Sequence, residues 1–355
     1  MHSTHLRKKH IHGGLLGIAI GESLAYSRRG LGSRQGLRLY GRPGQYSFLP
    51  RIGVYGEQTR LALLYSQALL NSRNEMSNLR PAFRWRLGWY LLSLPPGTKA
   101  ATLRSAAKCW LRKLKIDTST KAVDCSTMSR SILSGSIMHG TGHRITRWAE
   151  EITRLTHSSP LVLDANRVLA VFAGIACTAP EETEFGGVLQ AAIEVSEERE
   201  LREALQRLEP HLKAGSTPGK VMKSMGWDKV ADHPVPACVM GSYCWLRYPK
   251  NFLRSTLAAT RLGGAVDATA VVAGGLSGTH LGEKALPKQL KESLACGPHD
   301  AEWIQGVADR FSHWPHGADD LYMAPAQTSD PLGQVGRSLY YYPVHAYHAY
   351  KKRFR

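Results

Sequence analysis

The feature that most constrains the fold of this chain is the spacing of its apolar residues. They recur every three or four positions along most of the 355-residue sequence, whereas the alternation typical of a half-buried strand is nearly absent. This spacing predicts helices over residues 15–25, 59–71, 79–94, 99–114, 126–137, 146–156, 161–177, 184–194, 198–211, 237–246, 251–262 and 268–281. No fixed-period repeat links these segments, which argues against a solenoid. We therefore predict a single all-α globular domain.

The two ends of the chain lack this helical spacing. Residues 1–11 are a basic, histidine-rich N-terminal extension, which we expect to be frayed. Residues 313–355 are rich in Pro, Gly, Tyr and His, and we expect an irregular C-terminal tail that lies across the surface. The predicted all-α domain therefore spans residues 12–312.

Charge is distributed unevenly along the sequence. The chain has a net charge of +18, and residues 1–130 contribute 22 basic side chains against five acidic ones. The positive electrostatic field of residues 1–130 attracts an anionic partner, such as a phosphate group, a nucleic acid or an acidic lipid. A solvated surface that keeps the protein soluble explains the same charge. Both interpretations stay open.

The cysteines and the apolar segments indicate a cytoplasmic protein without a membrane span. The six cysteines are scattered and form no CxxC pair, so we expect small buried hydrophobes in a reducing compartment rather than disulfides or a zinc site. The longest apolar stretch, 161–179, is interrupted by Asp164 and Arg167, which argues against a bilayer span. The N-terminal residues imitate a secretory signal, but the first motif below assigns them to the folded domain.

Four sequence blocks point to a protein family. In chain order they read GLLGIAIGESL (14–24), VYGEQTRLAL (54–63), TRLTH (153–157) and LGGAVDATAVVAGGLSG (262–278), and a weaker fifth block reads CSTMSR (125–130). At this order and spacing, the set resembles the ADP-ribosylglycohydrolase family, which includes the dinitrogenase-reductase-activating glycohydrolase and the J1 crystallins. The resemblance covers about residues 12–292 and implies that family's all-α fold.

The resemblance implies a site at which this chain has changed. In the family, two Mg²⁺ ions, or Mn²⁺ in some members, lie between the second and fourth blocks and position an ADP-ribose group and a water. The matching ligand positions in this chain are Gly56, Glu57, Gln58, Ala265, Asp267 and Ala268. Only Glu57 and Asp267 keep a carboxylate, and two carboxylates cannot balance the charge of two divalent ions in a partly buried pocket. We expect no binuclear site, and at most one weakly held Mg²⁺ between Glu57 and Asp267.

Each of these acids also has a purely structural interpretation. Asp267 follows two glycines and precedes a long helix, so it can cap that helix. Glu57 can lie in the first turn of the helix predicted from Thr59 on, where the helix dipole favours an acid.

The resemblance adds four candidates for ligand binding: Glu22, His157, Gly263 and Gly264. Glu22 stands where the family has Asp and is a further catalytic candidate, although pairing with Arg28, Arg29 or Arg34 is the simpler expectation. His157 is a candidate base, but a lone histidine at a helix end is more often a structural hydrogen-bond partner.

Three functions remain open. The favoured one is a catalytically impaired family member that binds ADP-ribose, a related nucleotide or an ADP-ribosylated protein in the retained cleft. The second is an active hydrolase that uses Glu57, Asp267 and Glu22 in an altered metal site. The third is a nucleic-acid or protein-binding scaffold, because basic and aromatic residues alternate over 80–89 and 109–115. For those segments we prefer an amphipathic helix with its tryptophans in the core. The sequence does not predict an oligomeric state.

Overall fold

Helices provide nearly all the regular structure, as the apolar spacing predicts. The computed structural model describes residues 2–72, 75–111, 117–141, 143–179, 185–295, 299–311 and 331–354. Within these ranges, β pairing is limited to isolated bridges. The helices are α1 (His2–Ala25), α2 (Ser33–Tyr40), α3 (Glu57–Leu70), α4 (Met76–Leu92), α5 (Ala100–Trp110), α6 (Met128–Ile137), α7 (Arg144–Arg154), α8 (Pro160–Thr178), α9 (Phe185–Val195), α10 (Arg199–Gln206), α11 (Glu209–Lys213), α12 (Pro218–Ser224), α13 (Pro234–Arg247), α14 (Phe252–Thr260), α15 (Val266–Leu281), α16 (Lys288–Glu292), α17 (Ala301–Arg310) and α18 (Pro331–Phe354). The all-α prediction is confirmed.

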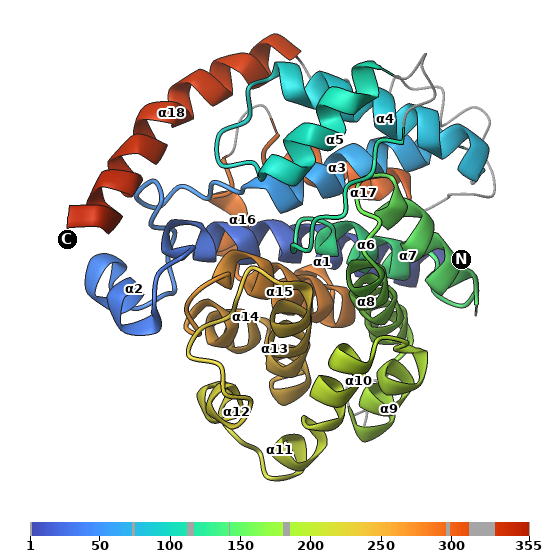
Figure 1. Cartoon of the computed structure of the whole chain (residues 1–355), viewed down its shortest axis with the longest axis vertical. Coiled ribbons are helices and arrows are strands. Elements are labelled where there is room, and N and C mark those ends of the chain that lie inside the picture. Colours follow the sequence, from blue (N-terminus) through green and yellow to red (C-terminus); the bar gives the residue numbers. More distant parts are fainter. Residues whose placement is uncertain are drawn as a thin grey trace.

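Helices α1 and α15 pack against each other through the middle of the molecule (Figure 1). Their glycines bring the two backbones into contact. A Cβ atom placed on Gly17 would lie 2.2 Å from the carbonyl oxygen of Gly274, and one on Gly21 would lie 2.2 Å from that of Ala270. Such distances leave no room for a side chain. The glycines of the first and fourth sequence blocks are thus required by helix packing.

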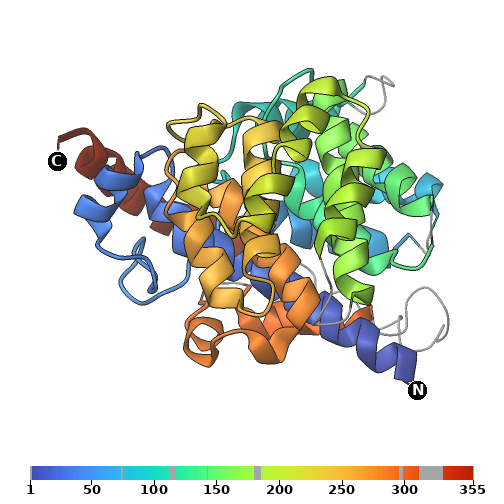
Figure 2. The same ribbon diagram turned by 90° about the horizontal axis from the view of Figure 1, so that it is seen from below.

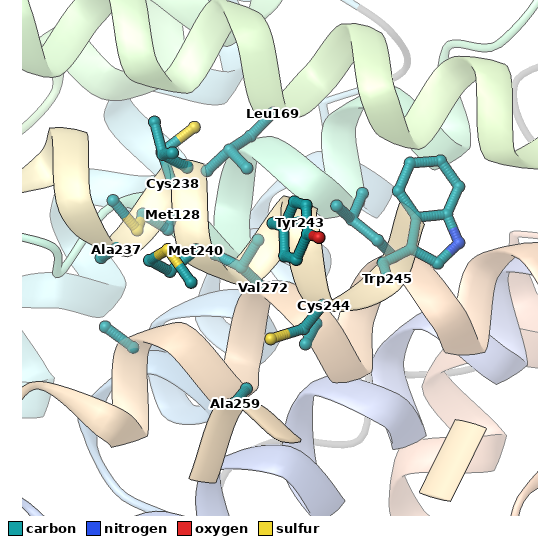
Figure 3. Packing of buried hydrophobic residues seen from close by; sticks show 14 of the residues in the cluster. Met128, Leu169, Ala237, Cys238, Met240, Tyr243, Cys244, Trp245, Ala259 and Val272 are labelled. Carbon is teal, nitrogen blue, oxygen red and sulfur yellow. The ribbon is translucent and has the colours of Figure 1, made fainter. Parts of the chain in front are cut away.

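Two hydrophobic clusters lie around this central pair. One combines the apolar face of α1 with α3, α4 and α17. The other joins α8, α13 and α15, and Figure 3 shows part of it, including Leu169, Tyr243 and Trp245. The five cysteines in the described part of the chain are free and buried, as expected of small apolar side chains.

Helix α8 is long and apolar enough, by length and composition, to cross a membrane. In the structure, 78% of its apolar window is buried inside the protein, where it packs against α6, α7 and α15. Its Asp164 is fully buried and pairs with Arg167, with 3.1 Å between Oδ1 and Nη2. In this structure α8 is a core helix.

The prediction of a frayed N-terminal extension over residues 1–11 is wrong for the described residues. Helix α1 begins at His2, and His10 and His12 are buried. The Nδ1 atom of His10 lies 2.6 Å from the carbonyl oxygen of Thr279, and Nε2 of His12 lies 2.9 Å from Oδ1 of Asp309. Contacts with distant elements therefore hold this segment in the helix.

The prediction of an irregular C-terminal tail is also wrong, because residues 331–354 form α18. This helix runs along one edge of the molecule, and the C-terminus lies at the same end as α2 (Figures 1 and 2). Its buried residues Ser338, Tyr341 and His348 are separated by three and seven positions, which places them on one face of a helix. The exposed tyrosines between them and Pro343 conceal this spacing in the sequence. Residues 313–330 of the predicted tail lie outside the described residues.

The preferred placement of the tryptophans in the core is wrong as well. Helix α4 buries Leu79, Phe83, Leu87 and Tyr90, and its tryptophans lie on the other face. Trp85, Trp89 and Trp110 are 45%, 41% and 44% exposed. Their ring centroids are 5.5 Å apart for Trp85 and Trp89, 5.6 Å for Trp89 and Trp110, and 6.4 Å for Trp85 and Trp110.

Candidate functional site

The N-terminal ends of α3, α5 and α15 bring the candidate residues together near Glu22, which lies close to the C-terminal end of α1. Glu57 is the first residue of α3, and Asp267 lies in the first turn of α15. Unpaired N–H groups make a helix N-terminus partly positive, which favours carboxylates there. The prediction that Glu57 lies in a first helical turn is confirmed.

Glu22 of α1 caps the N-terminus of α3 with both of its carboxyl oxygens. Oε1 accepts a hydrogen bond from the backbone N of Gln58 at 3.0 Å. Oε2 accepts from the backbone N of Thr59 at 2.9 Å and from its hydroxyl at 2.6 Å. Burial raises the pKa of Glu22 against these bonds, and the charge of Asp267 raises it further. The expected pairing of Glu22 with an arginine is therefore wrong, because a helix terminus supplies its partners instead.

Glu57 caps the N-terminus of α5 in a similar way. Its Oε2 accepts a hydrogen bond from the backbone N of Lys99, the N-cap residue of α5, at 3.0 Å. Glu57 is 3% exposed, and burial raises the pKa of its carboxyl group although the Lys99 charge and Thr102 lower it. Its Oε1 has no hydrogen-bond partner among the described residues.

Asp267 pairs with Arg29 and does not cap its helix through its side chain. Its Oδ2 lies 3.3 Å from Nε of Arg29, whereas the N-terminus of α15 carries no side-chain cap, so the capping interpretation is wrong. The charge of Asp267, and to a smaller extent that of Glu57, raises the pKa of Arg29, whereas burial lowers it. From α18, Nζ of Lys352 donates to the backbone oxygen of Arg29 at 2.8 Å, and burial lowers the pKa of Lys352 to about 8.

Lys99 is the second cation of this cluster. Its Nζ lies 2.6 Å from Oδ1 of Asp232 and 3.7 Å from Oδ1 of Asp124. Asp124 also approaches His157, whose Nε2 is 3.4 Å from Oδ2. Burial opposes a low pKa at Asp124, but the contacts with His157 and Lys99 lower it on balance. His157 is fully buried, and its other ring nitrogen lies 3.0 Å from the hydroxyl of Thr156.

The substituted ligand positions Gly56, Gln58, Ala265 and Ala268 are packed against neighbouring residues of the protein. A Cβ atom on Gly56 would lie 2.7 Å from Oε1 of Glu22 and 2.4 Å from the ring of Tyr26, so no larger side chain fits there without a shift. The Gln58 carbonyl accepts a hydrogen bond from the Ser129 hydroxyl at 2.7 Å. Ala265 and Ala268 are buried.

The two candidate glycines hold neighbouring loops together. Gly263 and Gly264 have φ angles of 85° and 80°, in the left-handed region that favours glycine. Gly264 exchanges backbone hydrogen bonds with Gly30 and Leu31 at 2.8 and 2.7 Å. The oxygen of Gly263 accepts from the N of Val230 at 3.0 Å.

These residues do not fit a binuclear Mg²⁺ centre. Such an ion needs several oxygen ligands in near-octahedral geometry, yet both oxygens of Glu22 and one each of Glu57 and Asp267 are engaged by the protein. Across the described ranges, no group of three or more His, Cys, Asp or Glu side chains is arranged to hold a metal ion.

Sequence reasoning named Arg29 only as a possible partner of Glu22, whereas it pairs with Asp267, and it missed Lys99. Arg29 follows the first block within a few residues, and Lys99 stands at the start of a predicted helix after a Pro-Pro-Gly turn. These sequence positions were the features that could have pointed to the two cations. Their partners Asp267 and Asp232 lie 238 and 133 positions further along the chain than Arg29 and Lys99, and only the fold brings them together.

Comparisons with known proteins agree with the fold and the sequence blocks. A solved structure described as an ADP-ribosylglycohydrolase-related protein complex is similar to this chain with a TM-score of 0.66 at 19% sequence identity, covering 87% of this chain and 99% of its own. No curated protein sequence matches significantly. The sequence model of the ADP-ribosylglycohydrolase family matches residues 3–321. The chain therefore belongs to the ADP-ribosylglycohydrolase family.

Proposed function

We propose that this chain is a family member that does not hydrolyse ADP-ribose linkages through a binuclear Mg²⁺ centre. We further propose that the ADP-ribose, related nucleotide or ADP-ribosylated protein it recognises is bound without metal. The observation that carries the proposal is the engagement of the acids: Glu22 caps α3, Glu57 caps α5 and Asp267 pairs with Arg29. An acid held in this way must break a buried contact before it can bind a cation.

Charge balance supports the same conclusion. Arg29 and Lys99 supply positive charge among the acids, so a divalent ion would add charge to a cluster that already has its cations. The residues Glu22, Glu57 and Asp267 are 1%, 3% and 5% exposed. A hydrolytic water needs access to the acid that activates it, and this conformation does not provide it.

The test is an assay of ADP-ribose release from ADP-ribosylated protein, together with calorimetry of ADP-ribose binding with and without Mg²⁺. We expect no release, and the same ADP-ribose affinity in both buffers. Mg²⁺-dependent release that Asp267→Asn abolishes would contradict the proposal and establish the active-hydrolase alternative. Asp232→Asn, which alters an exposed partner of Lys99, is the matched control.

The tryptophan cluster favours a second candidate function, the binding of single-stranded nucleic acid. Trp85, Trp89 and Trp110 are more than two-fifths exposed, and exposed indole rings beside basic residues can stack on bases. The third interpretation of the sequence thus gains support. The test is the salt dependence of binding to a single-stranded oligonucleotide: we expect a steep decline with salt and a marked loss in Trp89→Ala. Absent or salt-insensitive binding would exclude it.

A further inference from the structure

A cavity of about 400 Å³ lies between α2 and the turn that joins α14 to α15. None of the acids Glu22, Glu57 and Asp267 lines it, and neither do their cations Arg29 and Lys99, although the candidate glycine Gly263 does. Arg29 pairs with Asp267, whereas Arg28 reaches α2 and lines the cavity. Arg42 and Arg261 also line it, and no Asp or Glu is among the described residues of its wall.

Arg28 is a buried cation without an acidic partner in the described structure. It is 5% exposed, and its two terminal nitrogens donate to the carbonyl oxygens of Gly36, Tyr40 and Gly41 at 2.9, 3.0 and 2.9 Å. Its Nε has no hydrogen-bond partner there. The carbonyl groups of Tyr40 and Gly41 lie at the C-terminal end of α2, where the helix dipole favours a cation, but no carbonyl group carries a full negative charge, and a buried charge without a counter-ion is costly.

The other two arginines increase this excess of positive charge. Arg42 and Arg261 are exposed, and neither side chain makes an ion pair or a hydrogen bond with the residues described. Burial lowers the pKa of Arg28, and the nearby charge of Arg261 lowers it further, although Tyr40 raises it. An anion between them would relieve both costs.

The wall of the cavity is held by short backbone contacts. Gly32 and Gly263 form an antiparallel bridge, beside hydrogen bonds that join Gly264 to Gly30 and Leu31. Arg28 ties α2 to the same region through Gly36. A preformed wall reduces the ordering entropy that a ligand must overcome.

We propose that this cavity binds the phosphate group of a small molecule. Guanidinium groups donate parallel hydrogen bonds to phosphate oxygens, so arginine suits this anion. The hydroxyl of Ser33 and the apolar side chains of Leu37 and Val266 also line the cavity. They provide a surface for the less polar part of an organic phosphate, and the volume falls in the usual range of small-molecule sites.

The experiment is calorimetry of the full chain at low salt with three probes: inorganic phosphate, pyrophosphate and AMP. We expect pyrophosphate or AMP to bind, and Arg42→Gln with Arg261→Gln to weaken that binding at least tenfold. Both side chains are exposed, so the double variant is expected to fold. AMP tighter than pyrophosphate would identify an organic phosphate as the ligand, and the reverse order would identify inorganic phosphate or polyphosphate.

A matched control separates this site from general attraction by a basic protein. Arg34→Gln with Arg104→Gln removes two exposed positive charges outside the cavity. We expect it to retain the affinity within about twofold. An equal loss in both double variants, or no binding of any probe to the unaltered chain, would overturn the proposal.

Discussion

The contact between α1 and α15 and the acid cluster at the ends of α3, α5 and α15 are built from the same sequence blocks. In the helix contact, Gly17 and Gly21 leave space that the backbone of α15 fills. In the acid cluster, Glu22 caps the N-terminus of α3 and Asp267 pairs with Arg29. The same two blocks thus supply both the glycines of the helix contact and two acids of the cluster.

This difference shows which part of a family resemblance carries function. Backbone contact at a glycine tolerates no side chain, so the packing of α1 on α15 requires these glycines. A carboxylate at a metal-ligand position has to stay free only where a metal is bound. Where cations such as Arg29 and Lys99 supply the positive charge instead, the carboxylate can pair with them or with a helix terminus. Membership of the family is therefore secure evidence for the fold, while activity has to be argued from the site itself.

The largest effect is expected from breaking the helix contact. Gly17→Val places atoms against the carbonyl group of Gly274, and we expect a loss of more than about 4 kcal/mol in unfolding free energy, or no folded protein. The control is Gly187→Ala in α9, where a Cβ meets nothing within 4 Å, and it should be neutral or stabilising by about 0.5 kcal/mol. Urea unfolding measures both. A mild effect of Gly17→Val would show that the helices can separate.

The next effect comes from the cap of α3. Glu22→Ala leaves the backbone N–H groups of Gln58 and Thr59 buried without their partner, and we expect a loss of about 2–3 kcal/mol. Because burial raises the pKa of Glu22, the uncharged Glu22→Gln should lose less than Glu22→Ala. Thermal unfolding of both variants provides the measurement, and equal losses would contradict the capping role.

A smaller effect is expected at Asp267. Because Arg29 is 31% exposed in this pair, solvent screens the interaction, and Asp267→Asn should cost about 1 kcal/mol. The loss should be the same with and without Mg²⁺ in a denaturant titration. A Mg²⁺-dependent difference would mean that Asp267 binds the ion.

The smallest effect concerns the pH dependence of α18. Burial lowers the pKa of His345 to about 4, and its Nε2 lies 3.3 Å from the hydroxyl of Tyr26. A lowered pKa favours the docked, neutral form above the ordinary histidine pKa, and this stabilisation declines as the pH falls from about 6.5 towards 4. The protection of α18 amides against hydrogen exchange, corrected for the pH dependence of the intrinsic exchange rate, should therefore be weaker at pH 5 than at pH 7. His345→Gln, which cannot be protonated, should reduce the change; an unchanged pH response would exclude this histidine as its source.

Much of the fold could be predicted, because the apolar spacing and the glycines of α1 and α15 are local signals. Helix α18 could not, because its buried residues Tyr341 and His348 both contact Phe48, which lies about 300 positions earlier in the chain. The predicted helix over 198–211 divides into α10 and α11 at Arg207 and Leu208. Pro210 in the second position of α11 suits a helix start, a signal that the apolar spacing did not reveal.

The candidate site was predictable only in part. The family blocks identified Glu22, Glu57 and Asp267, which the structure places in one electrostatically coupled cluster. Their partners were not predictable, because a carboxylate can bind a metal, a helix terminus or an arginine with the same atoms. Only the three-dimensional positions of Arg29 and the α3 N-terminus distinguish these outcomes.

The most direct test of the central claim is calorimetric titration of Mg²⁺ into the full chain at neutral pH. If the acids are engaged by helix termini and by Arg29, no saturable heat of binding should appear at millimolar Mg²⁺. Saturable binding of one or two ions that disappears in Asp267→Asn would contradict the account, because it would show that the acids remain metal ligands.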